Sequence, residues 1–312
     1  MRLFVPLVAL ILAAPAPAQQ AQAPFTVQET GQGFAKLDDA VNSIRTGRGT
    51  ILIAPGTYRE CTVQTGGVIT FKAIEPGSVI FDGSPCEDKA IFVLRGDGTT
   101  VDGIIFRGVR VSDGNGAGIR TEMGDLTVTN SMFLDSQEGI LGGQPTGQRI
   151  TIDRSTFAGL GQCDETVDCA HSVYLSNNGS ITITRSRFER GTGGHYVKVR
   201  APVVTITDSS FDDSRGRKTN YHIDLPEGAT GLIAGNTFVQ GADKDNWSGF
   251  IVLAAEKRTF RTSGLRIEGN TATLAPGVRA DRSPAFVADL SHERIAMGKN
   301  TLGPGVRAFE TR

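Results

Sequence analysis

The sequence has almost no excess of charge of either sign. Its 32 Lys and Arg residues stand against 33 Asp and Glu residues, a formal net charge of −1 at pH 7. Such a balance gives no reason to expect nucleic acid or a membrane surface as a partner. After residue 14 the chain also lacks any run near the roughly 20 apolar residues that cross a bilayer as a helix. We therefore expect no membrane span, and any electrostatic binding site must be a local cluster.

The first 23 residues have the layout of a secretory signal peptide. Arg2 gives a positive start, an apolar run follows over Leu3–Ala14, and small residues with A-x-A spacing occur at Ala16–Ala18 and Ala21–Ala23. The run is too short to be a transmembrane anchor. We predict a signal peptide over residues 1–23, a single domain over residues 24–312, and a secreted or periplasmic location.

Cysteine is scarce, and no C-x-x-C pair suggests a redox or zinc site. The four cysteines are an even number in a chain predicted to be exported, which favours disulfides. Cys163 and Cys169 bracket a short polar segment and are expected to close it, while Cys61 and Cys86 lie about one repeat apart and could join neighbouring turns of the chain. Spacing alone leaves the other pairings open.

One phrase recurs along the chain: alternating apolar and polar residues, a small polar turn, and often a Phe. The spacing between copies is roughly 23 to 34 residues, which is typical of solenoids. The copies, the last three of them degenerate, are residues 126–133, 150–157, 181–188, 204–211, 232–238, 265–271 and 295–301.

The local period decides which solenoid this is. Apolar residues alternate with polar ones in short β-branched segments, and Gly, Asn, Asp and Ser separate these segments. No amphipathic helical segment recurs and the leucine-rich consensus is missing, whereas 39 glycines suit a chain that turns at every strand end. We predict an all-β fold, a single parallel β-helix whose short strands stack in register.

The N-terminal segment differs from the repeats. Residues 33–41 read as a short amphipathic helix that would cap the first turn, and residues 49–58 follow as a strand ending in Pro55-Gly56-Thr57-Tyr58. This order of a capping helix and a strand ending in P-G-x-Y resembles the pectin-lyase-like, right-handed parallel β-helix proteins. The resemblance covers nearly the whole domain and implies the fold, but it does not fix the chemistry.

Polar side chains are expected to gather where three histidine- or tyrosine-led segments stack. Aligning residues 171–176, 195–200 and 221–226 gives inward apolar columns and three outward columns. The first outward column holds Tyr174, Lys198 and Asp224, the second holds Ser172, Tyr196 and His222, and the third holds Ser176, Arg200 and Pro226. We expect His171 and His195, at the strand starts, to turn toward the surface. Arg120 is expected near the column of Lys198, across a segment, residues 139–143, that offers no large polar side chain.

A groove with Arg, Lys, Tyr and His suits an anionic glycan, because cations bind carboxylates and aromatic rings pack on sugars. The resemblance implies β-elimination at a uronic acid, and the Lys198 and Arg200 pair is similar to that of β-helix alginate and chondroitin lyases. We assign Lys198 as base, Arg200 with Arg120 as carboxylate binders, and Tyr174 or His195 as acid. The remaining substrate-binding candidates are His171, Tyr196, His222 and Asp224.

Other interpretations remain open. The block could be a structural ladder or a non-catalytic glycan-binding face of an envelope protein, and a uronate epimerase would share the proton abstraction. A glycoside hydrolase is less favoured, because the order of Gly194-His195, Asp212-Asp213 and Lys198-Val199-Arg200 differs from that family's motifs; Asp212-Asp213 reads as a turn. No cofactor is predicted. Calcium stays open, although no binding loop is recognisable among its oxygen-bearing candidates. We expect a monomer.

Overall fold

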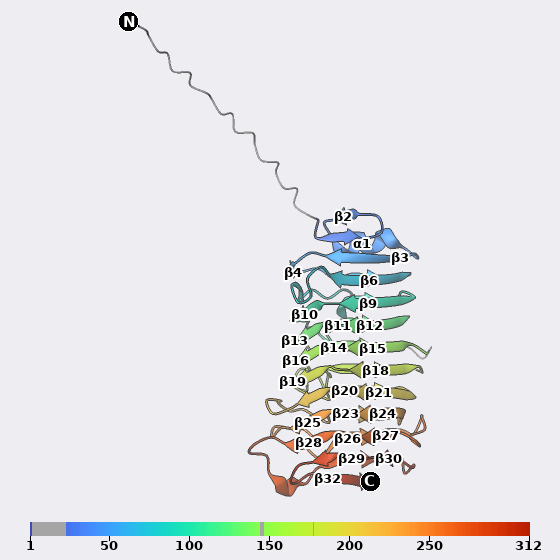
Figure 1. Ribbon diagram of the computed structural model, residues 1–312, viewed down its shortest axis with the longest axis vertical. Helices are drawn as coiled ribbons and strands as arrows, with labels where there is room; N and C mark the ends of the chain where they lie inside the picture. Colours follow the sequence, from blue (N-terminus) through green and yellow to red (C-terminus); the bar gives the residue numbers. More distant parts are fainter. Residues whose placement is uncertain (2–22, 144–146, 177) are drawn as a thin grey trace.

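The computed structural model describes residues 1, 23–143, 147–176 and 178–312. In that part of the chain the protein is an all-β parallel solenoid of about nine turns with one α-helix, α1 (Leu37–Ile44), and one short 3₁₀ helix, η1 (Ala280–Arg282). The predicted fold class is confirmed, and Figure 1 shows the strands stacked along one long axis. The predicted signal peptide, apart from its two end residues, lies outside the described residues.

Sheet A runs the length of the coil. Its strands, in spatial order, are β2 (Gln32–Phe34), β1 (Phe25–Val27), β3 (Arg48–Ile53), β6 (Val68–Ala73), β9 (Gly98–Asp102), β12 (Asp125–Thr129), β15 (Arg149–Asp153), β18 (Ser180–Thr184), β21 (Val203–Thr207), β24 (Thr230–Ala234), β27 (Arg266–Glu268) and β30 (Ala296–Met297). From β3 onward every pairing is parallel, whereas β1 pairs antiparallel with both β2 and β3.

Two further parallel sheets complete each turn. Sheet B contains β4 (Gly56–Tyr58), β7 (Val79–Asp82), β10 (Ile104–Arg107), β13 (Met132–Leu134), β16 (Thr156–Ala158), β19 (Arg187–Glu189), β22 (Ser210–Asp212), β25 (Thr237–Gln240), β28 (Thr271–Leu274) and β31 (Thr301–Leu302). Sheet C contains β5 (Thr62–Gln64), β8 (Ala90–Leu94), β11 (Ala117–Thr121), β14 (Glu138–Gly142), β17 (Val173–Ser176), β20 (Val197–Arg200), β23 (Ile223–Leu225), β26 (Gly249–Leu253), β29 (Ala285–Asp289) and β32 (Arg307–Thr311).

Each copy of the sequence repeat is the corner between sheet A and sheet B. In the first six of the seven copies the residue after the sheet A strand has positive φ, for example 50° at Asn130 and 49° at Arg185. The next residue is a Ser or Asn whose side chain satisfies the backbone of the preceding turn: Ser209 Oγ accepts the N–H of Ser186 at 3.1 Å. These short side chains form a ladder that supplies the hydrogen bonds the corner would otherwise leave unmade.

The Phe of each repeat points into the core. Consecutive rings lie nearly parallel with centroids 4.8–5.1 Å apart, matching the spacing of neighbouring strands. The stacked residues are Phe106, Phe133, Phe157, Phe188, Phe211 and Phe238. All six are at most 1% exposed. The stack therefore ties the register of sheet B to the packing of the interior.

The N-terminal turn is covered as predicted, although the boundaries differ. The helix begins at Leu37 and ends at Ile44, and Gly33 and Phe34, expected in the helix, belong to strand β2. Leu37, Ala40 and Val41 are buried against the first turn. Two antiparallel strands and one helix thus close the apolar end, which removes an edge that could pair with another chain.

All four cysteines form disulfides. Cys61 pairs with Cys86, with 5.4 Å between their Cα atoms, and Cys163 pairs with Cys169. The first bond joins adjacent turns and the second closes a short loop, as the spacing suggested. No helix among the described residues is long and apolar enough to span a membrane.

Replacing Phe188 with Ala is expected to lower the free energy of unfolding by about 3–5 kcal/mol, because it opens a cavity inside the ring stack. Thr182, on the outer face of β18, is the control, and Thr182→Ala should change stability by less than about 0.5 kcal/mol. Urea unfolding followed by circular dichroism measures both. Equal stabilities for the two variants would contradict the role of the stack.

Candidate functional site

Strand register brings the predicted side chains of sheet C together. Tyr174 pairs with Lys198 and Lys198 with Asp224, so the register of the first column is as predicted, but Asp224, expected on the outer surface, is only 3% exposed. Arg120 belongs to the same column, since it pairs with Leu141 and Leu141 pairs with Tyr174. Figure 1 shows the sheet C strands of this region, β11 to β23, following one another along the axis.

The second outward column is wrong. Tyr196 is 1% exposed and His222 is 0% exposed, and both lie in the interior. The strands begin only at Val197 and Ile223, so the two-residue alternation does not extend back to these positions. His222 stacks on Phe250, with ring centroids 5.0 Å apart, and lines no outer surface. Neither residue can touch a substrate.

A cavity of about 480 Å³, which we call the central cavity, lies over sheet C. Its lining includes five residues predicted for the site: His171, Tyr174, His195, Lys198 and Arg200. They come from two consecutive strands, β17 and β20, and from the turns that lead into them. The remaining polar lining comes from Asn115, Asp168, Asn220 and Glu256.

Glu256 binds both cations of the central cavity and was not predicted. Its Oε1 lies 2.8 Å from Lys198 Nζ and its Oε2 lies 2.6 Å from Arg200 Nη1. Hydrogen bonds from Arg200 and Lys198 lower the pKa of Glu256 to about 2. Glu256 sits in the irregular segment after β26, and no repeat signal marks it. Its carboxylate shows that Lys198 and Arg200 converge on one carboxylate-sized position.

Tyr174 lies against the same two cations. Its hydroxyl accepts a hydrogen bond from Arg200 Nε at 3.0 Å, and Lys198 Nζ lies 5.7 Å from the centre of its ring. Burial opposes the charge of Arg200, but hydrogen bonds to Glu256 and Tyr174 raise its pKa. Because Arg200 donates to the phenol oxygen, the Tyr174 O–H remains able to donate toward the cavity.

Asp224 lies beneath the cavity rather than in its lining. Its Oδ2 is 3.7 Å from Lys198 Nζ and 3.4 Å from His195 Nε2, while its Oδ1 is buried with no hydrogen-bond partner among the described residues. Burial raises the pKa of Asp224 to about 7, against the opposing charges of Lys198 and Arg200. Asp224 can therefore gain or lose a proton near neutral pH beside Lys198.

Two histidines form a ladder along one wall. The backbone N–H of His195 donates to Nδ1 of His171 at 3.0 Å, and that of Tyr221 donates to Nδ1 of His195 at 3.2 Å. Burial, with the charges of Lys198 and Arg200, lowers the pKa of His171 to about 3; burial also holds that of His195 well below its usual value. Both imidazoles are neutral at ordinary pH, and accepting at Nδ1 leaves the proton on Nε2.

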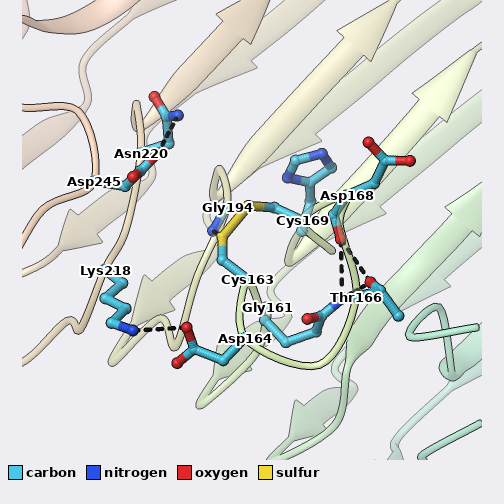
Figure 2. Close-up of a disulfide and its surroundings, with 12 residues drawn as sticks. Gly161, Cys163, Asp164, Thr166, Asp168, Cys169, Gly194, Lys218, Asn220 and Asp245 are labelled. Atoms are coloured by element: carbon cyan, nitrogen blue, oxygen red, sulfur yellow. Dashed lines mark hydrogen bonds and ion pairs between the residues drawn. A yellow bond between two sulfur atoms is a disulfide. The ribbon is translucent and has the colours of Figure 1, made fainter.

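The Cys163–Cys169 loop forms another wall of the central cavity. Figure 2 shows Gly194 beside the disulfide, where its N–H donates to Cys163 Sγ at 3.2 Å. Lys218 Nζ, 2.6 Å from Asp164, connects this loop to a later turn. The loop thus holds the backbone directly before His195.

Of the Asp212-Asp213 pair, which was predicted to form a turn, only Asp212 has the contacts of a turn residue. Asp212 Oδ1 accepts the N–H of Ser214 at 2.9 Å, as in a turn, but Asp213 is completely buried. Its Oδ2 lies 2.9 Å from Nζ of the equally buried Lys244, and its Oδ1 accepts the Tyr196 hydroxyl at 2.7 Å. This network lies in the interior behind the site, and a pattern of turn residues could not reveal it.

Two further expectations are corrected or limited by the structure. Residues 139–143 were expected to contribute no large polar side chain to the surface. Leu141 of this segment lines a second cavity of about 300 Å³ together with Arg120 and Tyr174. Within the described ranges, no three His, Cys, Asp or Glu side chains gather in a way that could hold a metal ion. These ranges thus give no carboxylate cluster that singles out a calcium site.

No protein-family model matches the sequence, and no curated protein matches it either. Solved structures with a similar fold include the deglycosylated pectin methylesterase of Aspergillus niger, at 11% identity and a TM-score of 0.44, covering 95% of this chain and 91% of that one. The structure of Escherichia coli YbhC is similar at 12% identity and a TM-score of 0.46, covering 95% and 89%. Neither likeness carries an argument about function.

Asp224→Asn is expected to remove a pH dependence of stability. Asp224 has a pKa of about 7 in the folded protein, whereas an unfolded chain releases this proton near the ordinary aspartate pKa of 3.8. The contribution of Asp224 is therefore full below pH 4 and is lost as the pH rises to 7. Relative to Asp224→Asn, the wild type should lose on the order of 1 kcal/mol per pH unit across this window.

Urea unfolding at intervals from pH 4 to pH 8 measures this difference. Asp135, whose side chain is 66% exposed, provides the control, and Asp135→Asn should leave the slope unchanged. A wild-type stability that stays level or rises relative to Asp224→Asn would show that Asp224 is ionised throughout.

Proposed function

We propose that the protein is a polysaccharide lyase that cleaves a uronic-acid-containing glycan by β-elimination. The observation that carries the proposal is the carboxylate of Glu256, held jointly by Lys198 and Arg200 in an open cavity beside Tyr174. A uronate carboxylate that takes this position is bound by Arg200 and lies beside Lys198. Neutralising that carboxylate acidifies the adjacent carbon–hydrogen bond, which is the first requirement of the reaction.

The roles follow from the contacts. Arg200 binds the uronate carboxylate in place of Glu256. Glu256 then leaves this position and no longer contacts Lys198. Lys198 then lies 3.7 Å from Asp224, which as a carboxylate accepts the ammonium proton; burial raises the pKa of Asp224 to about 7 and makes it a stronger base than an ordinary carboxylate. Neutral Lys198 removes the proton from the carbon next to the carboxylate, a carbon–carbon double bond forms as the glycosidic carbon–oxygen bond breaks, and Tyr174 protonates the departing oxygen.

His195 has a different role here from the acid first assigned to it, whereas His171 remains a substrate-binding candidate. His195 carries no extra proton at ordinary pH, so it is not the acid; its Nε2 N–H faces Asp224 Oδ2, 3.4 Å away, and helps to position that carboxyl. His171, equally neutral, presents the same kind of donor on the neighbouring turn. The Nε2 N–H of His171 suits a sugar hydroxyl at the cavity wall.

A non-catalytic glycan-binding protein is the second candidate. Glu256 and Glu227 already pair with Arg200, at 2.6 Å and 3.3 Å, and such pairing is also what a structural ladder of a β-helix surface would show. Either function suits an exported protein, because two disulfides are stable in an oxidising compartment.

Incubation with polygalacturonate, alginate and glucuronate-containing glycans tests the lyase. Cleavage by elimination leaves an unsaturated sugar, so ultraviolet absorbance should rise on at least one polymer. New reducing ends without that absorbance would indicate a hydrolase. A changed uronate configuration in an intact chain would indicate an epimerase, and binding without any reaction would indicate the glycan-binding protein.

Lys198→Ala should lower the rate on the accepted polymer by about 100-fold or more, since removal of a general base has that effect. Lys72, exposed on sheet A, is the matched control, and Lys72→Ala should keep full activity. Tyr174→Phe should slow turnover while binding is retained. Full activity in Lys198→Ala would remove this residue from the mechanism.

A further inference from the structure

The second cavity, lined by Arg120, Leu141 and Tyr174, adjoins the central cavity, and we call it the Arg120 cavity. Both are lined by Asn115 and Tyr174, and the Arg120 cavity is floored by Leu141, Gly142 and Gly143. A Cβ atom on Gly142 would lie 2.0 Å from the backbone oxygen of Thr121, with φ of 133°, so no larger residue fits there. In the column itself Leu141, which is 8% exposed, lies between Arg120 and Tyr174. The two cavities thus share Asn115 and Tyr174 and are separated by an apolar side chain that carries no charge.

The charge around Arg120 is not fully compensated. Its Nε is buried without a hydrogen-bond partner among the described residues, and the nearest carboxylate oxygen, on Glu122, is 3.8 Å away. Glu122 already binds Lys89 at 3.0 Å and Arg95. Burial raises the pKa of the neighbouring Glu138 well above its usual value, which disfavours the charged form of this carboxyl.

On this basis we propose that the Arg120 cavity is a second carboxylate subsite, which binds another uronate unit of the same chain that occupies the central cavity. The proposal rests on the proposed function for its substrate class. Arg120 and Lys198 lie three strand positions apart in one column, about 14 Å at a spacing of about 4.8 Å per strand. That separation exceeds one sugar ring, so the ligand is an oligomer that runs along the axis of the coil. Leu141 and the ring of Tyr174 provide the apolar surface between the two charges.

Calorimetric titration with uronate disaccharides and tetrasaccharides, made from galacturonate, mannuronate and glucuronate-containing polymers, tests the subsite. The wild type should bind a tetrasaccharide more tightly than the matching disaccharide. Arg120→Gln should weaken tetrasaccharide binding about tenfold or more, as expected for loss of a charge-assisted hydrogen bond, and leave disaccharide binding within about twofold. Arg120→Lys should restore part of the difference.

Arg149, exposed on sheet A, is the control, and Arg149→Gln should bind both ligands as the wild type does. The subsite would be overturned if Arg120→Gln weakened the binding of both ligands equally or weakened the binding of neither. It would also be overturned if the wild type did not bind the tetrasaccharide. Turnover is measured separately. If the protein is an active lyase but Arg120→Gln leaves tetrasaccharide affinity unchanged, only the subsite is contradicted. If Arg120→Gln weakens tetrasaccharide binding but the protein cleaves no polymer, only the lyase is contradicted.

Discussion

The in-register stacking of parallel strands is the constraint on which the whole molecule depends. Each strand pairs residue for residue with the strands before and after it, so a side chain repeats its position about 4.8 Å further along the axis. Inside, this repetition turns single Phe residues into a continuous stack. Outside, it turns separate residues of sheet C into one column from Arg120 to Asp224. A slip of one residue would exchange the two faces.

The turns beside the site depend on buried charge rather than on strand pairing. Lys244 and Asp213 are both inaccessible, and the carboxylate also accepts hydrogen bonds from Tyr196, Thr219 and Gly241. A buried ion pair is tolerated only when its remaining polar atoms are satisfied in this way. Thr219 also bridges the backbone of Gly194 and of Lys244, so the network orders the turns that lead into β20 and β23.

The protonation state of each ionisable group in the site follows from how deeply that group is buried. The histidines are driven neutral by desolvation and nearby cations, Asp224 is held near its midpoint at neutral pH, and Glu256, the most exposed of these groups, is firmly ionised. One cavity thus holds neutral donors, a carboxyl that can change its protonation, and two cations bound to a replaceable carboxylate. Such separation of pKa values is typical of sites that move protons.

Residue order alone was enough for the coil, the corner repeat, the disulfide spacing and the column of Tyr174, Lys198 and Asp224, because all of these follow from short-range alternation and a fixed repeat. It could not locate Glu256, which comes from an irregular segment without periodicity, nor the interior placement of Tyr196 and His222. Those positions depend on where each turn ends and its strand begins, which is decided by packing between turns far apart in the chain. The protonation of Asp224 and of the histidines was likewise decided only by burial in the folded molecule, since desolvation has no counterpart in the linear sequence.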